Sequence, residues 1–121
     1  MSVDLDRLIE RADELWELSI LPSLSEFIAI EALSPGFEPD WEAKGELDSA
    51  INLFSNWLID QKLDGMTYQV HRIEGRTPVL LITVEGTGPG EVIFYSHLDK
   101  QPSREKLWSE GLHPLKAVRR E

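Results

Sequence analysis

Cysteine is absent from this chain of 121 residues, which excludes a disulfide framework and any metal site built on thiolates. Long apolar runs are absent as well. None approaches the roughly 18 residues that a transmembrane helix needs, so no membrane span is expected. The amino terminus carries Asp4, Asp6 and Glu10 instead of the basic residues of a secretory signal. Together these absences predict a cytoplasmic protein.

Basic residues are scarce beside acidic ones. The chain holds 12 Lys and Arg against 22 Asp and Glu, a formal net charge of −10. The excess lies in residues 1–65, with 15 acidic and 4 basic side chains, whereas residues 66–121 are nearly balanced. Because affinity for a phosphate backbone is built from Lys and Arg, no nucleic-acid partner is expected. The acidic first half is typical of a solvated helical face.

The first 63 residues show helical periodicity. Apolar residues recur at three- and four-residue spacing over residues 5–16, and Pro22 interrupts this pattern. Ser23 and Glu26 then have the spacing of a capping box. They predict a second helix that ends near residue 34, just before a proline.

A loop and a third helix follow. Residues 34–44 contain two prolines that stiffen the loop, and Phe37 and Trp41 that could anchor it. Residues 46–62 carry apolar side chains along one helical face: Leu47, Ala50, Ile51, Phe54, Trp57 and Leu58.

The pattern then changes to that of strands. Residues 67–73 alternate, residues 74–76 form a turn, and residues 79–84 and 92–95 are continuously apolar. Such runs are expected of strands covered on both faces. The predicted fold class is therefore α/β, with helices over about 4–63, strands over about 67–96, and a loop and tail over 97–121. Two buried strands need more cover than 121 residues offer, which predicts a single but incomplete domain.

The residues best suited to chemistry follow the last predicted strand. In open α/β sheets, ligands bind beyond the carboxyl ends of strands, and His97 lies at such an end. Residues two apart on an extended chain face the same way, so His97 and Asp99 should project together. A metal-bound imidazole commonly donates its other N–H to a carboxylate. The pair therefore suits a metal ligand and its orienting partner, although His-x-Asp alone is a weak pattern.

The surrounding sequence carries a stronger signal. Residues 95–102, YSHLDKQP, resemble the first metal motif of the metallopeptidase family that includes carnosinase-type dipeptidases, aminoacylase and glutamate carboxypeptidase. Residues 34–41, SPGFEPDW, look like a loop of the dipeptidase branch. Residues 107–114, LWSEGLHP, look like the segment that follows the metal motif there. The similarity spans roughly residues 20–118.

This resemblance implies a hydrolase of peptide or amide bonds, with two zinc ions bridged by a carboxylate and a water or hydroxide. His97 matches the histidine ligand of one zinc ion, and Asp99 matches the carboxylate that orients it. The substrate would be a peptide or dipeptide. No other residue here matches a ligand or the glutamate base, and in the family the bridging aspartate belongs to a segment expected soon after Glu121. The chain alone is thus expected to be inactive, the amino-terminal part of an enzyme.

Three positions depart from the family pattern. Ser96 stands where glycine is usual, which puts the close backbone packing beside His97 in doubt. His113 and Leu115 fall where glycine and tryptophan are common.

Other interpretations stay open. The chain could be a small non-catalytic module that binds itself or a protein partner through open sheet edges, and a homodimer could complete a zinc site that has one histidine in each copy. His71 and His113 have the setting of ordinary surface residues. A loose basic cluster suits a solvated loop or attraction of a substrate carboxylate: Lys100, Arg104 and Lys106.

Overall fold

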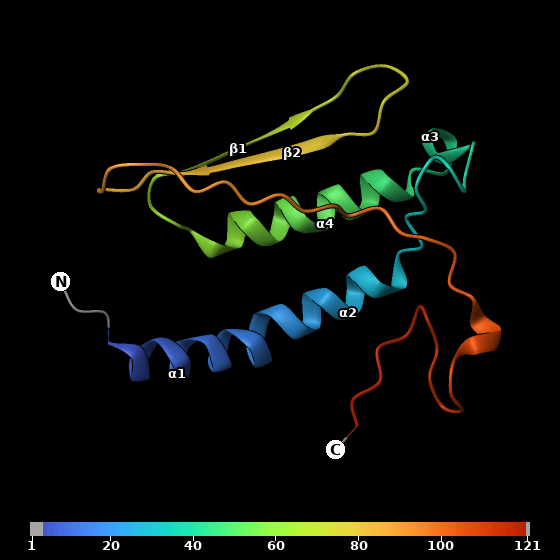
Figure 1. Cartoon of the computed structure of the whole chain (residues 1–121), viewed down its shortest axis with the longest axis horizontal. Helices are drawn as coiled ribbons and strands as arrows, with labels where there is room; N and C mark the ends of the chain where they lie inside the picture. Colours follow the sequence, from blue (N-terminus) through green and yellow to red (C-terminus); the bar gives the residue numbers. More distant parts are fainter. Residues whose placement is uncertain (1–3, 121) are drawn as a thin grey trace. The chain divides into compact units, whose positions relative to one another are not determined.

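The computed structural model describes residues 4–120. The chain forms helices followed by a two-stranded antiparallel sheet, a mixed α/β arrangement (Figure 1). Its described residues divide into two compact units, one of residues 31–103 and one of residues 4–30 with 104–120. The single partial domain stays a prediction, and its outer bounds, residues 1 and 121, lie outside the described residues.

Three helical segments follow one another without a break: α1 (Leu5–Leu15), the π-helical turn η1 (Trp16–Ile20) and α2 (Leu21–Ala29). The predicted interruption at Pro22 is wrong. The N–H of Leu21 donates to the carbonyl oxygen of Trp16, five residues earlier, which is the wider bond of a π turn. Pro22 thereby falls in the first turn of α2, where a missing N–H is best tolerated.

The ends of α2 also differ from the prediction. Because α2 continues from η1, no side chain caps its start, so the capping box is not formed. The helix ends at Ala29, well before residue 34. Beyond it, Ala32 has a positive φ of 25°, and the N–H of Ser34 donates to the carbonyl oxygen of Lys100 at 3.0 Å. Long-range backbone pairing therefore replaces the expected last turn.

The unit of residues 31–103 contains the short helix α3 (Trp41–Lys44) and the helix α4 (Glu46–Gln61). Gly45 joins them with a positive φ of 68°, and its N–H donates to the carbonyl oxygen of Trp41 at 3.1 Å. A left-handed residue ends α3 and lets the chain restart as α4 at once, a geometry that glycine adopts with little strain. The predicted helix over 46–62 is confirmed.

The core of this unit lies along α4. Its fully or nearly fully buried apolar residues are Ala32, Leu47, Ala50, Ile51 and Leu58, each at most 8% exposed. Four of these five come from the face of α4 that the sequence predicts to be apolar, and Phe54 and Trp57 on that face are half-buried.

The sheet is the predicted hairpin. Strand β1 (Met66–His71) pairs with β2 (Val79–Val84) in antiparallel register, from Met66 opposite Val84 to His71 opposite Val79. The connecting turn is closed by the N–H of Arg76, which donates to the carbonyl oxygen of Ile73 at 3.0 Å.

The predicted burial of the strands is wrong in two respects. Residues 92–95 form no strand with any described residue, and their side chains are 80–91% exposed. In β2 only Leu80 is half-buried, so neither face is covered as expected. A strand is buried only where other elements supply partners for its backbone and both faces, and the described residues place none there.

In the second unit, an exposed ion pair joins the tail to η1. The guanidinium of Arg119, in the tail that follows the short helix η2 (Glu105–Leu107), donates to both carboxylate oxygens of Glu17 at 2.8 Å. This bidentate pair lowers the pKa of Glu17 and raises that of Arg119. None of the helices between residues 4 and 120 is long and apolar enough to cross a bilayer.

Candidate metal-binding site

His97 and Asp99 lie in the stretch that leads from β2 to residue 100. Two hydrogen bonds hold the backbone of Lys100. Its N–H donates to the carbonyl oxygen of Ala32 at 2.9 Å, and its own carbonyl oxygen accepts from the N–H of Ser34. Asp99 directly precedes Lys100, and its side chain is 38% exposed, while the His97 side chain is 71% exposed. The imidazole is therefore open to solvent, and the carboxylate is attached to an anchored part of the backbone.

The two side chains are hydrogen-bonded to each other. His97 Nδ1 lies 2.9 Å from Asp99 Oδ1 and 3.0 Å from the carbonyl oxygen of Asp99. Both oxygens are acceptors at neutral pH, so the hydrogen between them and the ring belongs to Nδ1. In the neutral ring Nε2 then keeps its lone pair. This is the tautomer that a metal ligand needs, fixed by a carboxylate as in many histidine–metal sites.

His113 and His71 differ from His97 in their surroundings. His113 Nδ1 accepts the backbone N–H of Leu115 at 3.1 Å, so the neutral ring of His113 carries its hydrogen on Nε2 and has no lone pair to offer there. His71 lies on β1 and is exposed. Of the three, His97 has the hydrogen bond that leaves Nε2 available.

Among the described residues, no further metal ligand joins His97. Within residues 4–120, no three His, Asp or Glu side chains gather so that they could hold a metal ion. A stable zinc site takes about four ligands, or three with an open position. The residues present fit one ligand with its orienting partner, and they do not fit a complete site for one zinc ion or two.

Lys100 has a different environment from that of a solvated loop lysine. Its partial burial is the largest influence on its pKa and lowers it, while the negative charges of Glu46 and Glu31 act in the opposite direction. Lys100 is thus half-buried beside acidic groups, whereas Arg104 and Lys106 are exposed.

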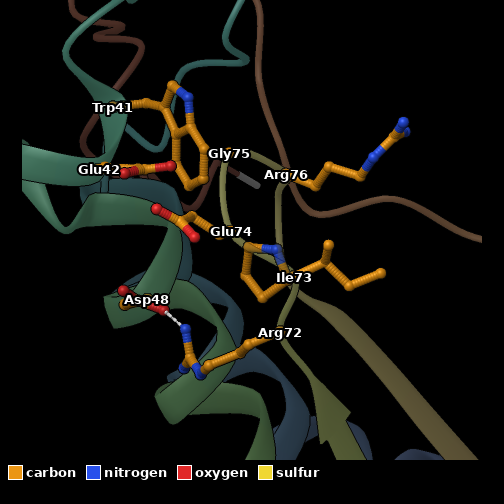
Figure 2. A pocket seen from close by; sticks show the side chains of 9 residues that line it. Trp41, Glu42, Asp48, Arg72, Ile73, Glu74, Gly75 and Arg76 are labelled. Carbon is orange, nitrogen blue, oxygen red and sulfur yellow. Dashed lines mark hydrogen bonds and ion pairs between the residues drawn. The ribbon is translucent and has the colours of Figure 1, made fainter.

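A cavity of about 300 Å³ lies elsewhere in the same unit, between the start of α4 and the turn of the hairpin (Figure 2). Arg72 forms an ion pair with Asp48 across it. Figure 2 also shows Arg76 extending away from Trp41. Neither His97 nor Asp99 lines this cavity, which is formed by Trp41, Glu42, Asp48, Arg72, Ile73, Glu74, Gly75, Arg76 and Pro78.

Sequence reasoning did not find this cavity. It identified the loop before α4 and the turn at residues 74–76 separately, and predicted that Trp41 anchors its loop. The sequence carries only a weak sign that this loop and this turn lie close together. Asp48 and Arg72 have opposite charges but lie 24 residues apart, and no periodicity connects a helix with a hairpin turn.

The chain was also compared with known proteins. A scan against models of known protein families finds none that matches, and a search of curated proteins finds no match either.

Proposed function

We propose that this chain is the amino-terminal part of a di-zinc metallopeptidase of the dipeptidase type, in which His97 binds one zinc ion. The observation that carries the proposal is the hydrogen bond of 2.9 Å between His97 Nδ1 and Asp99 Oδ1. It occurs within residues 95–102, the segment that resembles the first metal motif of the family. Pattern and side-chain geometry thus agree on the same two residues.

The roles of the two residues follow from their chemistry. His97 presents the lone pair of Nε2, and the carboxylate of Asp99 holds the ring by its Nδ1 hydrogen and raises its basicity. A zinc ion held by His97 and by ligands outside these residues would supply Lewis-acid activation of a carbonyl and of an attacking water. A peptide or dipeptide is the proposed substrate. The remaining ligands and the glutamate base would come from residues outside these 121.

Zinc titration followed by NMR of the imidazole nitrogens tests the role of His97. Because a site with a single ligand binds weakly, we expect millimolar zinc to shift the Nε2 resonance of His97 selectively. Asp99→Asn should weaken this effect about tenfold or more, since it removes the orienting carboxylate. His113→Ala is the matched control and should leave the effect unchanged. Equal shifts at His71, His97 and His113 would refute the assignment.

The peptidase part of the proposal has its own test. Coding sequence downstream of residue 121 should encode an acidic segment of the Gly-x-Gly-x-x-Asp-Asp kind, and a protein that includes it should hydrolyse dipeptides. His97→Ala should abolish that hydrolysis. A downstream sequence with no acidic ligands, or activity unaffected by His97→Ala, would contradict the proposal.

The alternative function, self-association without catalysis, involves other residues. It does not need His97 or Asp99, so either proposal can fail while the other stands.

A further inference from the structure

The stretch that holds His97 is paired through its backbone with a segment far away in the sequence. The N–H of Lys100 donates to the carbonyl oxygen of Ala32 at 2.9 Å, and the N–H of Ser34 donates to the carbonyl oxygen of Lys100 at 3.0 Å. These two bonds form a parallel bridge between Lys100 and Leu33 (Figure 1). The bridge therefore fixes the backbone three residues beyond His97.

One peptide group connects this bridge with the imidazole of His97. The peptide between Asp99 and Lys100 has its N–H bonded to the carbonyl oxygen of Ala32, and its carbonyl oxygen lies 3.0 Å from His97 Nδ1. Nδ1 thus shares its hydrogen between this carbonyl oxygen and Asp99 Oδ1, which is 2.9 Å away. Hydrogen bonds in such a chain polarise one another, so each strengthens the next. The orientation of the ring therefore depends on Ala32 through a single peptide group.

Ala32 has a backbone and a size that suit this contact. Its φ is 25°, a left-handed angle that is uncommon outside glycine and least accessible to β-branched residues. Its side chain is 0% exposed, so a larger side chain would have to displace its neighbours. Backbone strain of this kind persists only where surrounding contacts hold it, and it is concentrated at functional sites.

The side chain of Lys100 is held toward the same part of the unit. Lys100 is half-buried, and the negative charges of Glu31 and Glu46 act on its ammonium group. Glu31 directly precedes Ala32, and Glu46 begins α4. Backbone pairing and charge attraction thus bring Lys100 to the segment that contains Ala32.

We infer that Ala32 positions the metal ligand: its carbonyl oxygen, acting through the peptide group that follows Asp99, keeps the hydrogen of His97 on Nδ1 and leaves Nε2 free to bind a metal ion. Ala32 is a positioning residue and not a ligand. All the contacts involved lie within the unit of residues 31–103. The orientation of the ring is a property of this chain, whereas its use for zinc rests on the proposed function.

NMR of the metal-free chain, at a pH where the imidazole is neutral, tests this inference. The nitrogen shifts of His97 report which nitrogen carries the hydrogen, and amide exchange reports the bond from Lys100. The wild type should carry the hydrogen on Nδ1 and protect the Lys100 amide. Ala32→Val should remove that protection, because valine does not tolerate the positive φ. It should also shift the tautomer ratio about fivefold toward the Nε2–H form, the effect of losing one ordinary hydrogen bond.

Two further variants separate positioning from packing. Ala50→Val adds the same atoms at another site that is 0% exposed, and it should leave the tautomer of His97 unchanged although it overpacks the core. Ala32→Gly tolerates the positive φ and should keep both the Lys100 bond and the tautomer. An equal tautomer shift in Ala50→Val, or lost Lys100 protection with an unchanged tautomer in Ala32→Val, would overturn the inference. If Ala32→Val does not fold, the wild type alone decides: a hydrogen on Nε2 of His97, or an unprotected Lys100 amide, overturns it.

Zinc added to the same samples distinguishes this inference from the proposed function. Ala32→Val should weaken the response of His97 Nε2 to zinc together with the tautomer, and Ala50→Val should not. A wild type that has the expected tautomer but whose Nε2 does not respond to zinc would contradict the proposed function and leave the positioning by Ala32 standing.

Discussion

Helix α4 has one apolar face and residues 92–95 are apolar throughout, yet the apolar face of α4 is largely buried and residues 92–95 are exposed. α4 buries Leu47, Ala50, Ile51 and Leu58, whereas residues 92–95 are at least 80% exposed. A helix satisfies its own backbone hydrogen bonds and needs cover on one face only. A strand is fully buried only when it has backbone partners at its edges and cover on both faces. Apolar character alone therefore does not determine burial.

The largest expected effect compares one residue type in the two regions. Ile51 is 5% exposed and Ile93 is 87% exposed. Ile51→Ala should lower the free energy of unfolding by about 2–4 kcal/mol, because it leaves a cavity beside α4. Ile93→Ala should change it by less than about 0.5 kcal/mol in the monomer. Urea titration at low protein concentration measures both.

If Ile51→Ala fails to fold, Ile51→Val gives a milder test, with an expected loss of about 0.5–1.5 kcal/mol. Equal destabilisation by the substitutions at positions 51 and 93 would show that the two regions do not differ in burial.

A smaller effect on stability is expected from substitutions of the glycines that precede the two regions, Gly45 and Gly86. Gly45 precedes α4 with a positive φ of 68°, and no atom would lie within 4 Å of an added Cβ. Gly45→Ala should therefore destabilise the chain by about 1 kcal/mol through backbone strain alone. Gly86, before residues 92–95, has equally open space without a positive φ, so Gly86→Ala should be neutral or slightly stabilising. Thermal unfolding of both variants provides the comparison, and a larger loss at Gly86 would contradict it.

The smallest effect concerns the charges of the loop that leads into α4. A side-chain hydrogen bond from Lys44 lowers the pKa of Glu38, and the backbone N–H of Asp40, 3.1 Å from its carboxylate, lowers it further. A lowered pKa stabilises the fold above the ordinary glutamate pKa of about 4.3, and this contribution is lost as the pH falls through the lower value in the folded chain.

The stability difference between wild type and Glu38→Gln should consequently shrink on acidification. Urea midpoints measured from pH 7 down to pH 3 follow this change. The same comparison in a Lys44→Gln background is the control, because it removes the largest cause of the lowered pKa of Glu38, and the dependence there should be smaller. A difference that grows at low pH would contradict the predicted sign.

Local patterns predicted the elements that depend on local interactions. The apolar face of α4 and the β1–β2 hairpin follow from spacing of three to four residues and from short-range turn chemistry, and both are confirmed. Pro22 was misjudged because its effect depends on the preceding turn: a π-type bond from Leu21 to Trp16 accommodates the proline without ending the helix.

The same distinction between local and long-range interactions separates the His97–Asp99 pair from the cavity near Trp41. The spacing of His97 and Asp99 is local, and their side chains lie within hydrogen-bond distance. The cavity near Trp41 joins residues of α3, α4 and the hairpin turn, so no local pattern could reveal it. The metal-binding roles of His97 and Asp99 stay predictions.

The sequence by itself determined the absence of disulfides, the acidic charge, the helical face of α4, the hairpin and the pairing of His97 with Asp99, because each depends on composition or on neighbours a few residues apart. Only the tertiary structure decided that residues 92–95 are exposed, that no strand within residues 4–120 other than β1 pairs with β2, and that the backbone of Ala32 bonds to that of Lys100. Burial and long-range pairing depend on which distant segments come to lie beside one another, and that is a property of the whole fold.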